Sequence, residues 1–139
     1  MPAKLDGRSV LVVDDDQDVL TTVKMAFEAS GAEVTTARDG NMAVELARRL
    51  SPDLIVLDMM MPKRSGFLVV ETLKPEHDPE KKPYVIMITA NEGKRHAEYA
   101  RYLGVNDYVH KPFSMDQVLE TACNLLGGEF VDPERKPEG

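Results

Sequence analysis

The sequence predicts an α/β fold in which a doubly wound, five-stranded parallel sheet carries helices on both faces. Five short apolar runs alternate with amphipathic stretches whose apolar residues recur at helical spacing. Strands that alternate with helices pair in parallel through right-handed crossovers, which places the helices on both faces. The 139 residues fit a single domain. We expect that domain over residues 1–126 and a flexible C-terminal tail over residues 127–139.

Five segments are expected to form the strands, in chain order: Ser9–Val13, Ala32–Ala37, Asp53–Leu57, Tyr84–Thr89 and Asn106–His110. The first is continuously apolar and β-branched, which is typical of a strand buried on both faces. The second is less apolar and is therefore expected nearer an edge of the sheet. The segment Lys74–Pro83, with three prolines and many charges, predicts an exposed loop before the fourth strand.

Five helices are expected between and after these strands: Val19–Ser30, Asp39–Leu50, Ser65 to about Leu73, about Glu92 to Leu103, and Ser114–Leu126. Asp39, Ser65 and Ser114 are residue types that cap helix N-termini with a side-chain oxygen. Glycines close the first, fourth and fifth helices, since glycine readily adopts the left-handed conformation after a helix. Ser51-Pro52 ends the second.

The formal net charge of −7 excludes some classes of partner. Binding to nucleic acid needs clustered Lys and Arg that replace phosphate counterions, so we expect no nucleic-acid partner. An anionic membrane surface is disfavoured for the same reason, and no apolar run is long enough to span a bilayer. Because Cys123 is the single cysteine and the N-terminus lacks a signal peptide's apolar segment, we expect a reducing, cytoplasmic location.

Chemically active residues follow four of the five expected strands. Asp14 and Asp15 come directly after the first strand, and Asp58 after the third. Thr89 ends the fourth strand and Lys111 follows the fifth. Since the carboxyl ends of parallel strands lie at one edge of a sheet, where ligands bind, these side chains are expected to converge.

Such a group of side chains suits phosphoryl transfer with Mg²⁺. Mg²⁺ takes one or two carboxylates, keeps several waters and shares its remaining positions with phosphate oxygens. An aspartate can form an aspartyl phosphate. Phosphoryl transfer depends mainly on positioning and on neutralising charge, which a cation and an ammonium supply, while a hydroxyl can hold a phosphoryl oxygen.

On four motifs taken together, the chain resembles the receiver domains of bacterial two-component response regulators, over about Arg8 to Leu126. The motifs are VLVVDDD (Val10–Asp16), LIVLDMMMP (Leu54–Pro62), ITA (Ile88–Ala90) and DYVHKPF (Asp107–Phe113). The resemblance implies a flavodoxin-like fold with strand order 2-1-3-4-5, an order that places the first and third strands side by side.

The resemblance also implies a role for each residue of the site. Asp58 is the phosphoacceptor, and Mg²⁺ is held by Asp14, Asp15, Asp58 and the backbone carbonyl of Met60. Thr89 hydrogen-bonds the phosphoryl group and Lys111 pairs with the acceptor carboxylate, held by a cis bond to Pro112. Tyr108 is the aromatic residue that turns inward when Thr89 moves, so modification shifts the populations of two states.

Two residues are expected to modulate the rate of phosphoryl loss. In the family, the positions of Met60 and Asn91 flank the path of the attacking water. We hypothesise that the apolar side chain of Met60 partly excludes this water and lengthens the phosphorylated lifetime. The chain departs from the family's common pattern at Arg64 and Ser65, of which Ser65 can still cap a helix.

The leading interpretation is a stand-alone regulator resembling chemotaxis regulators, with no output region after the domain. A sensor histidine kinase or a phosphotransfer protein donates the phosphoryl group, and the surface around Tyr108 and the last two helices controls a downstream protein. Such a protein catalyses only its own phosphorylation and dephosphorylation, and is a monomer or a phosphorylation-dependent dimer. A phosphate shuttle in a phosphorelay is an alternative within this class.

Two other classes are open. Asp14-x-Asp16 resembles the DxD of haloacid-dehalogenase-type phosphatases, in which the first aspartate, here Asp14, is the nucleophile. Against this class, Asp18 stands where Thr or Val is usual, no cap segment is visible, and Asp58 lacks a role. A degenerate receiver that only binds partners is disfavoured because every required active residue is present.

Overall fold

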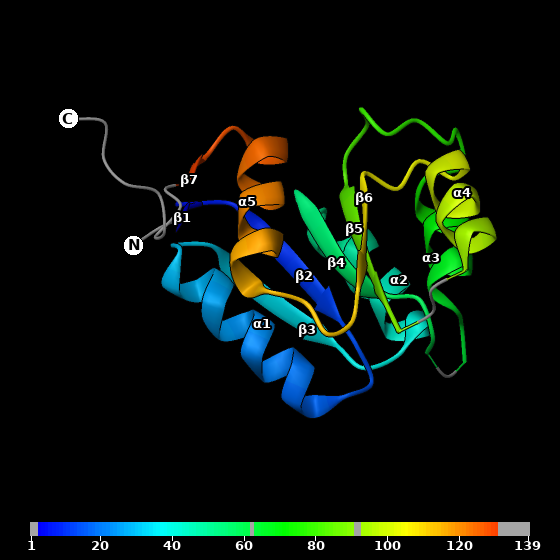
Figure 1. The fold of residues 1–139 in the computed structure, drawn as a ribbon, viewed down its shortest axis with the longest axis horizontal. Coiled ribbons are helices and arrows are strands. Elements are labelled where there is room, and N and C mark those ends of the chain that lie inside the picture. Colours follow the sequence, from blue (N-terminus) through cyan, green and yellow to red (C-terminus); the bar gives the residue numbers. More distant parts are fainter. Residues whose placement is uncertain (1–2, 62, 91–92, 131–139) are drawn as a thin grey trace.

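The computed structural model describes residues 3–61, 63–90 and 93–130. Its main sheet has five parallel strands, namely β2 (Ser9–Val13), β3 (Glu33–Ala37), β4 (Leu54–Asp58), β5 (Tyr84–Thr89) and β6 (Asp107–His110). Their spatial order is β3-β2-β4-β5-β6 (Figure 1). This confirms the predicted order 2-1-3-4-5, since the short N-terminal strand β1 (Ala3–Lys4) moves each label by one. The less apolar β3 lies at an edge, as expected.

Two layers of helices cover the sheet. The helices are α1 (Gln17–Ala29), α2 (Gly40–Leu50), α3 (Gly66–Leu73), α4 (Lys94–Tyr102) and α5 (Met115–Leu126). Figure 1 shows α1 and α5 on one face and α2, α3 and α4 on the other. None of the helices in the described ranges is both long and apolar enough to cross a bilayer.

The alternation of side chains along the strands divides the core in two. In β2, Val10 and Val12 belong to the apolar cluster under α1 and α5, while Leu11 and Val13 belong to the cluster under α2, α3 and α4. Successive side chains of a strand point to opposite faces, so a strand covered on both sides has to be apolar throughout. All five residues of β4 are buried, including its last residue, Asp58.

The expected caps are present, with one difference. The side chains of Asp39 and Ser65 accept hydrogen bonds from the backbone N–H groups of Met42 and Leu68, at 2.8 and 3.4 Å. Ser114 occupies the N-cap of α5 but makes no capping hydrogen bond with its side chain. The described part of α4 begins at Lys94, and Glu92, where the helix was expected to begin, lies outside the described residues.

Lys74 departs from the expected exposed loop, since it is only 4% exposed. Its ammonium donates to the backbone carbonyls of Lys81 and Pro83, at 2.7 and 3.0 Å. A buried polar group is tolerated when it is hydrogen-bonded, and two carbonyls meet that need here. Burial lowers the pKa of the Lys74 ammonium, an effect that Asp78 partly opposes. Lys74 therefore stabilises the loop that leads into β5 through these two hydrogen bonds.

A second, two-stranded sheet was not expected from the sequence. β1 pairs antiparallel with β7 (Glu129–Phe130), which lies just after α5 and within the expected tail. The Arg8 guanidinium donates to the carbonyl of Leu126 at 2.8 Å and adds a second tie between these parts of the chain. The two ends of the domain therefore lie side by side (Figure 1).

Candidate functional site

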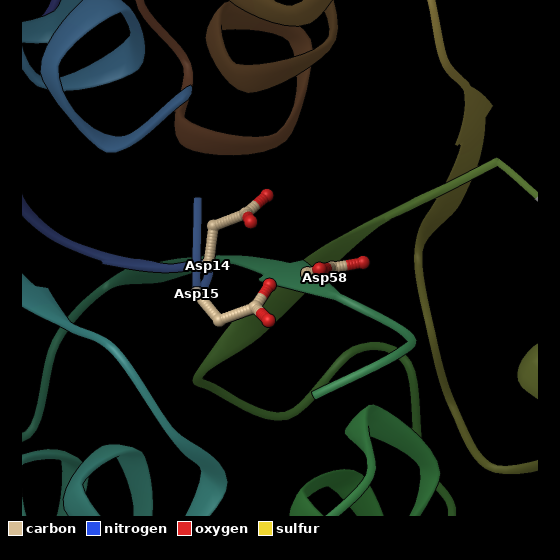
Figure 2. Close-up of side chains that lie close together, drawn as sticks. All are labelled: Asp14, Asp15 and Asp58. Carbon is tan, nitrogen blue, oxygen red and sulfur yellow. The ribbon is translucent and has the colours of Figure 1, made fainter. Parts of the chain in front are cut away.

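The register of the sheet determines which residues meet at the carboxyl ends of the strands. Val13 in β2 lies opposite Leu57 in β4, so the residues that follow them, Asp14 and Asp58, are neighbours. Asp58 in turn lies opposite Ile88, the residue before Thr89. Figure 2 shows the side chains of Asp14 and Asp15 beside that of Asp58. The predicted convergence of these residues is therefore observed.

The three aspartates form a compact set of oxygen ligands. One carboxylate oxygen from each of Asp14, Asp15 and Asp58 lies within 4.8 Å of the others. Asp14 and Asp58 are 2% and 5% exposed, whereas Asp15 is exposed. Hard divalent cations prefer such carboxylate oxygens, and an open side leaves room for water or phosphate oxygens. The donor set therefore fits Mg²⁺.

The charge of Asp58 is unfavourable in these surroundings. The pKa of its carboxyl is raised to about 6, first by burial and then by the neighbouring carboxylates of Asp14 and Asp15. The ammonium of Lys111 and the Met60 N–H, which donates to Oδ1 of Asp58 at 3.2 Å, act in the opposite direction. Negative charges crowded at a buried site favour either a proton or a cation there.

Lys111 supplies the positive charge at this edge. Its Nζ lies 3.1 Å from Oδ2 of Asp14 and 3.7 Å from Oδ2 of Asp58, so it is nearer to Asp14 than to the expected acceptor. Burial alone would lower the pKa of Lys111, but its hydrogen bond to Asp14 and the charges of Asp58 and Asp14 raise it. The Lys111–Pro112 bond is cis, as the resemblance implied.

Asp16 has a different role from the two aspartates before it. Its side chain caps α1 by accepting hydrogen bonds from the backbone N–H groups of Asp18 and Val19. Its own N–H donates to Oδ1 of Asp14 at 2.9 Å. The acidic run is thus divided between a ligand set and a helix cap.

The expected switch residues lie close to the site. Thr89 is fully buried at the end of β5. Tyr108 is half-buried, and its hydroxyl lies 3.6 Å from Sδ of Met59, the residue after Asp58. This contact between Met59 and Tyr108 was not expected from the sequence. It connects the end of β4, which carries Asp58, with the ring of Tyr108.

Gly66 is a second residue that sequence reasoning missed. A Cβ atom at this position would lie 2.6 Å from the carbonyl oxygen of Asp58 and 2.9 Å from Cα of Met59. Only a residue without a side chain allows α3 to begin this close to the strand end. The glycine directly after the capping Ser65 was the available signal.

Two residues, Met60 and Asn91, were predicted to modulate the rate of phosphoryl loss. The side chain of Met60 is 65% exposed. Asn91 lies outside the described residues. Their influence on the site therefore stays a prediction, as does coordination by the carbonyl of Met60.

Comparison with known proteins agrees with this geometry. A family model of the response regulator receiver domain matches residues 10–122. The probable transcriptional regulatory protein TcrX of Mycobacterium tuberculosis is 38% identical over an alignment of 125 residues, and the match covers 88% of this chain and 52% of TcrX. The chain spans about half the length of the curated relatives it matches.

Solved structures of receiver domains have the same fold. The Francisella response regulator 1452 receiver domain is 30% identical, with a TM-score of 0.79 over 87% of this chain and 98% of that one. A chain of the CheX-CheY-BeF3-Mg²⁺ complex of Borrelia burgdorferi is 25% identical, with a TM-score of 0.78 over 86% of this chain and 90% of that one. Given the matched family model, the strand order and the aspartates at the strand ends, this chain belongs to the response regulator receiver domains of two-component systems.

Proposed function

We propose that Asp58 accepts a phosphoryl group from the phosphohistidine of a sensor histidine kinase or a phosphotransfer protein. The observation that carries this proposal is the cluster of three carboxylates, within 4.8 Å of one another, beside the ammonium of Lys111. A carboxylate oxygen of Asp58 attacks phosphorus while the N–P bond of the donor breaks. The electron pair of that bond stays on the imidazole, and an acyl phosphate forms on Asp58.

The residues around Asp58 would balance the charge that this step brings in. When bound by Asp14, Asp15, Asp58 and the carbonyl of Met60, Mg²⁺ would neutralise carboxylate and phosphoryl oxygens. Lys111 would offer its ammonium to the phosphoryl group, and the hydroxyl of Thr89 would donate to one of its oxygens. The Mg²⁺ in the related Borrelia complex supports this choice of cation.

Adding Mg²⁺ is expected to raise the free energy of unfolding of the wild-type chain by about 2.7 kcal/mol at 100 times its dissociation constant. The cation relieves the repulsion among Asp14, Asp15 and Asp58. Urea unfolding with and without Mg²⁺ measures this gain. Asp15→Asn should lose most of it, whereas Asp18→Asn, an exposed aspartate of the same acidic run, should keep it. If Asp15→Asn and Asp18→Asn lose the same part of the Mg²⁺-dependent gain in stability, the cation only screens the acidic surface and does not bind at the three aspartates.

We further propose that phosphorylation is read out at the surface around Tyr108, α4 and α5. The hydroxyl of Tyr108 donates a hydrogen bond to Sδ of Met59. Tyr108 lies in β6, and Thr89 of the neighbouring β5 lies opposite His110 of β6. Movement of the Thr89 hydroxyl toward the phosphoryl group would therefore alter the packing of the Tyr108 ring. This coupling would shift a two-state equilibrium that a downstream protein senses.

Met60→Asn is expected to speed dephosphorylation by about threefold, because a polar side chain would help the attacking water approach the acyl phosphate. Decay of the phosphorylated protein, followed by intact mass, measures the rate. Met25→Asn is the matched control, since Met25 is 64% exposed and lies on α1, away from the site. An unchanged lifetime in Met60→Asn would remove Met60 from the mechanism.

The phosphatase alternative is disfavoured by the positions of its two aspartates. Asp14 is buried and held by Lys111, while the side chain of Asp16 is engaged in capping α1. A general acid has to be free to reach the leaving group. Asp14 is therefore poorly placed to act as the nucleophile, and Asp16 is poorly placed to act as the general acid. Asp58 is the better candidate for accepting a phosphoryl group.

The wider setting is also a proposal. We place the chain in the cytoplasm, as a monomer or a phosphorylation-dependent dimer, with a downstream protein and not nucleic acid as the partner of residues 1–126. The sequence has a single cysteine, the buried Cys123, and can therefore form no disulfide within the chain, which supports a reducing compartment. Relay of the phosphoryl group to a further histidine remains the second candidate within this function.

A further inference from the structure

A furrow lies between α2 and α3, on the face of the sheet that these two helices cover together with α4. One hollow of about 710 Å³ is lined by Val44, Arg48, Arg49 and Arg64, among others. A second hollow, of about 360 Å³, is lined by Ala47, Arg48 and Leu73, among others. Because Arg48 lines both, the two hollows are neighbouring parts of one furrow.

The rim of this furrow is basic on a chain whose net charge is −7. Arg48 and Arg49 are exposed in the last turn of α2. Arg64 is held from the other side, since its Nη1 donates to Oγ1 of Thr72 at 3.2 Å. Glu45 is the one acidic residue among those lining the first hollow. Three guanidinium groups therefore oppose a single carboxylate there.

The side chain of Arg64 extends along the furrow, from the start of α2 to Thr72 in α3. Gly40, at the start of α2, packs directly against the backbone of Arg64. Arg48 lies eight residues further along the same helix, which corresponds to about 12 Å. Val44 and Ala47, both buried, form an apolar floor between these positions. A single phosphate group would not cover this floor.

A purely structural role accounts for only part of this arrangement. Basic residues in the last turn of a helix interact favourably with its dipole, which explains one or both arginines of α2. Arg64 lies outside α2, and its guanidinium is positioned by the hydrogen bond to Thr72 of α3 and not by the dipole of α2.

We propose that the α2–α3 furrow binds an acidic, amphipathic segment of a partner protein. Its carboxylates would pair with Arg48, Arg49 and Arg64, because guanidinium groups match carboxylates in a two-pronged geometry. Its apolar side chains would cover Val44 and Ala47. The interaction is separate from phosphoryl transfer and uses none of the residues at the sheet edge.

A fluorescein-labelled peptide of repeating Glu-Glu-Leu-Leu is the probe, titrated with the full, unphosphorylated chain and followed by fluorescence anisotropy. Arg48→Gln/Arg49→Gln should weaken binding about tenfold, a loss of about 1.4 kcal/mol. Lys94→Gln/Arg101→Gln is the matched control, because it removes the same charge from another exposed helix. The control should change affinity less than about threefold, since charges beyond the screening length act weakly.

Backbone amide shifts on addition of the peptide should cluster on α2 and α3. The proposal is overturned if the two double variants weaken binding equally, or if the shifts cluster on α4. It is also overturned if pyrophosphate displaces the peptide and shifts the same residues, which would indicate a site for a small anion. Asp58→Asn should bind the peptide as the wild type does, so failure here is distinct from failure of the phosphoacceptor role.

Discussion

Asp58→Asn is expected to raise the free energy of unfolding at pH 7, in the absence of divalent cations, by up to about 3 kcal/mol. The pKa of Asp58 is raised from 3.8 to about 6, first because of burial and then because of Asp14. The folded state therefore binds this proton more tightly than the unfolded state, and ionisation above pH 6 costs stability. Asparagine removes that charge while keeping the shape of the side chain.

The same shift fixes the sign of the pH dependence. The wild-type chain should gain stability through this group as the pH falls from about 7 to about 4, whereas Asp58→Asn should lack this contribution. Urea unfolding in EDTA at pH 7 and pH 5 measures the free energy of unfolding of the wild type and of Asp58→Asn, and its change with pH. A variant that is no more stable than the wild type at pH 7 would contradict the electrostatic account.

Asp53→Asn is the matched control, at the opposite end of the same strand. Burial alone would raise the pKa of Asp53, but hydrogen bonds from Lys82 and from the Ser9 backbone outweigh it and lower the pKa. The ionised carboxylate is therefore stabilising there, and its replacement should lower the free energy of unfolding. Asp53, just before β4, and Asp58, at its end, should thus respond with opposite signs.

Lys111→Met is expected to slow phosphorylation by a small-molecule phosphodonor by about 100-fold or more at neutral pH. Its ammonium is the positive side chain that lies 3.7 Å from Asp58. Removing it leaves the incoming phosphoryl charge beside three carboxylates with less compensation. The rate of adduct formation by intact mass measures the loss. Lys111→Arg, which keeps the charge but changes its geometry, should recover part of the rate.

Lys111→Met would also be phosphorylated slowly if it failed to fold. The free energy of unfolding of each variant is therefore measured together with its phosphorylation rate. Lys82→Met is the control, because Lys82 also pairs with an aspartate, Asp53, but at the opposite end of β4. If Lys82→Met and Lys111→Met slow phosphorylation equally, Lys111 has no specific role.

The site was predictable because strand ends are visible in the sequence. Continuous apolar runs mark buried strands, and parallel pairing places the residues that follow them at one edge. Asp14, Asp15, Asp58, Thr89 and Lys111 were expected there on this ground, and the strand order agrees with it. One-residue differences in strand bounds, such as Asp58 falling inside β4, did not alter the convergence.

Features that depend on contacts distant in sequence were not predictable. Lys74 is buried because two carbonyls of the following loop receive its ammonium. β1 and β7 are two residues each, too short to show a periodic pattern, and their pairing joins opposite ends of the domain. The Tyr108–Met59 contact and the basic furrow depend in the same way on how neighbouring elements pack.

The most direct test of the account is the intact mass of the chain after incubation with phosphoramidate and Mg²⁺. The wild-type chain should gain one phosphoryl group, and Asp58→Asn should gain none. Peptide mapping of the wild-type adduct should place it on Asp58. An adduct that persists in Asp58→Asn, or one that maps to Asp14, would contradict the role of Asp58 as the phosphoacceptor.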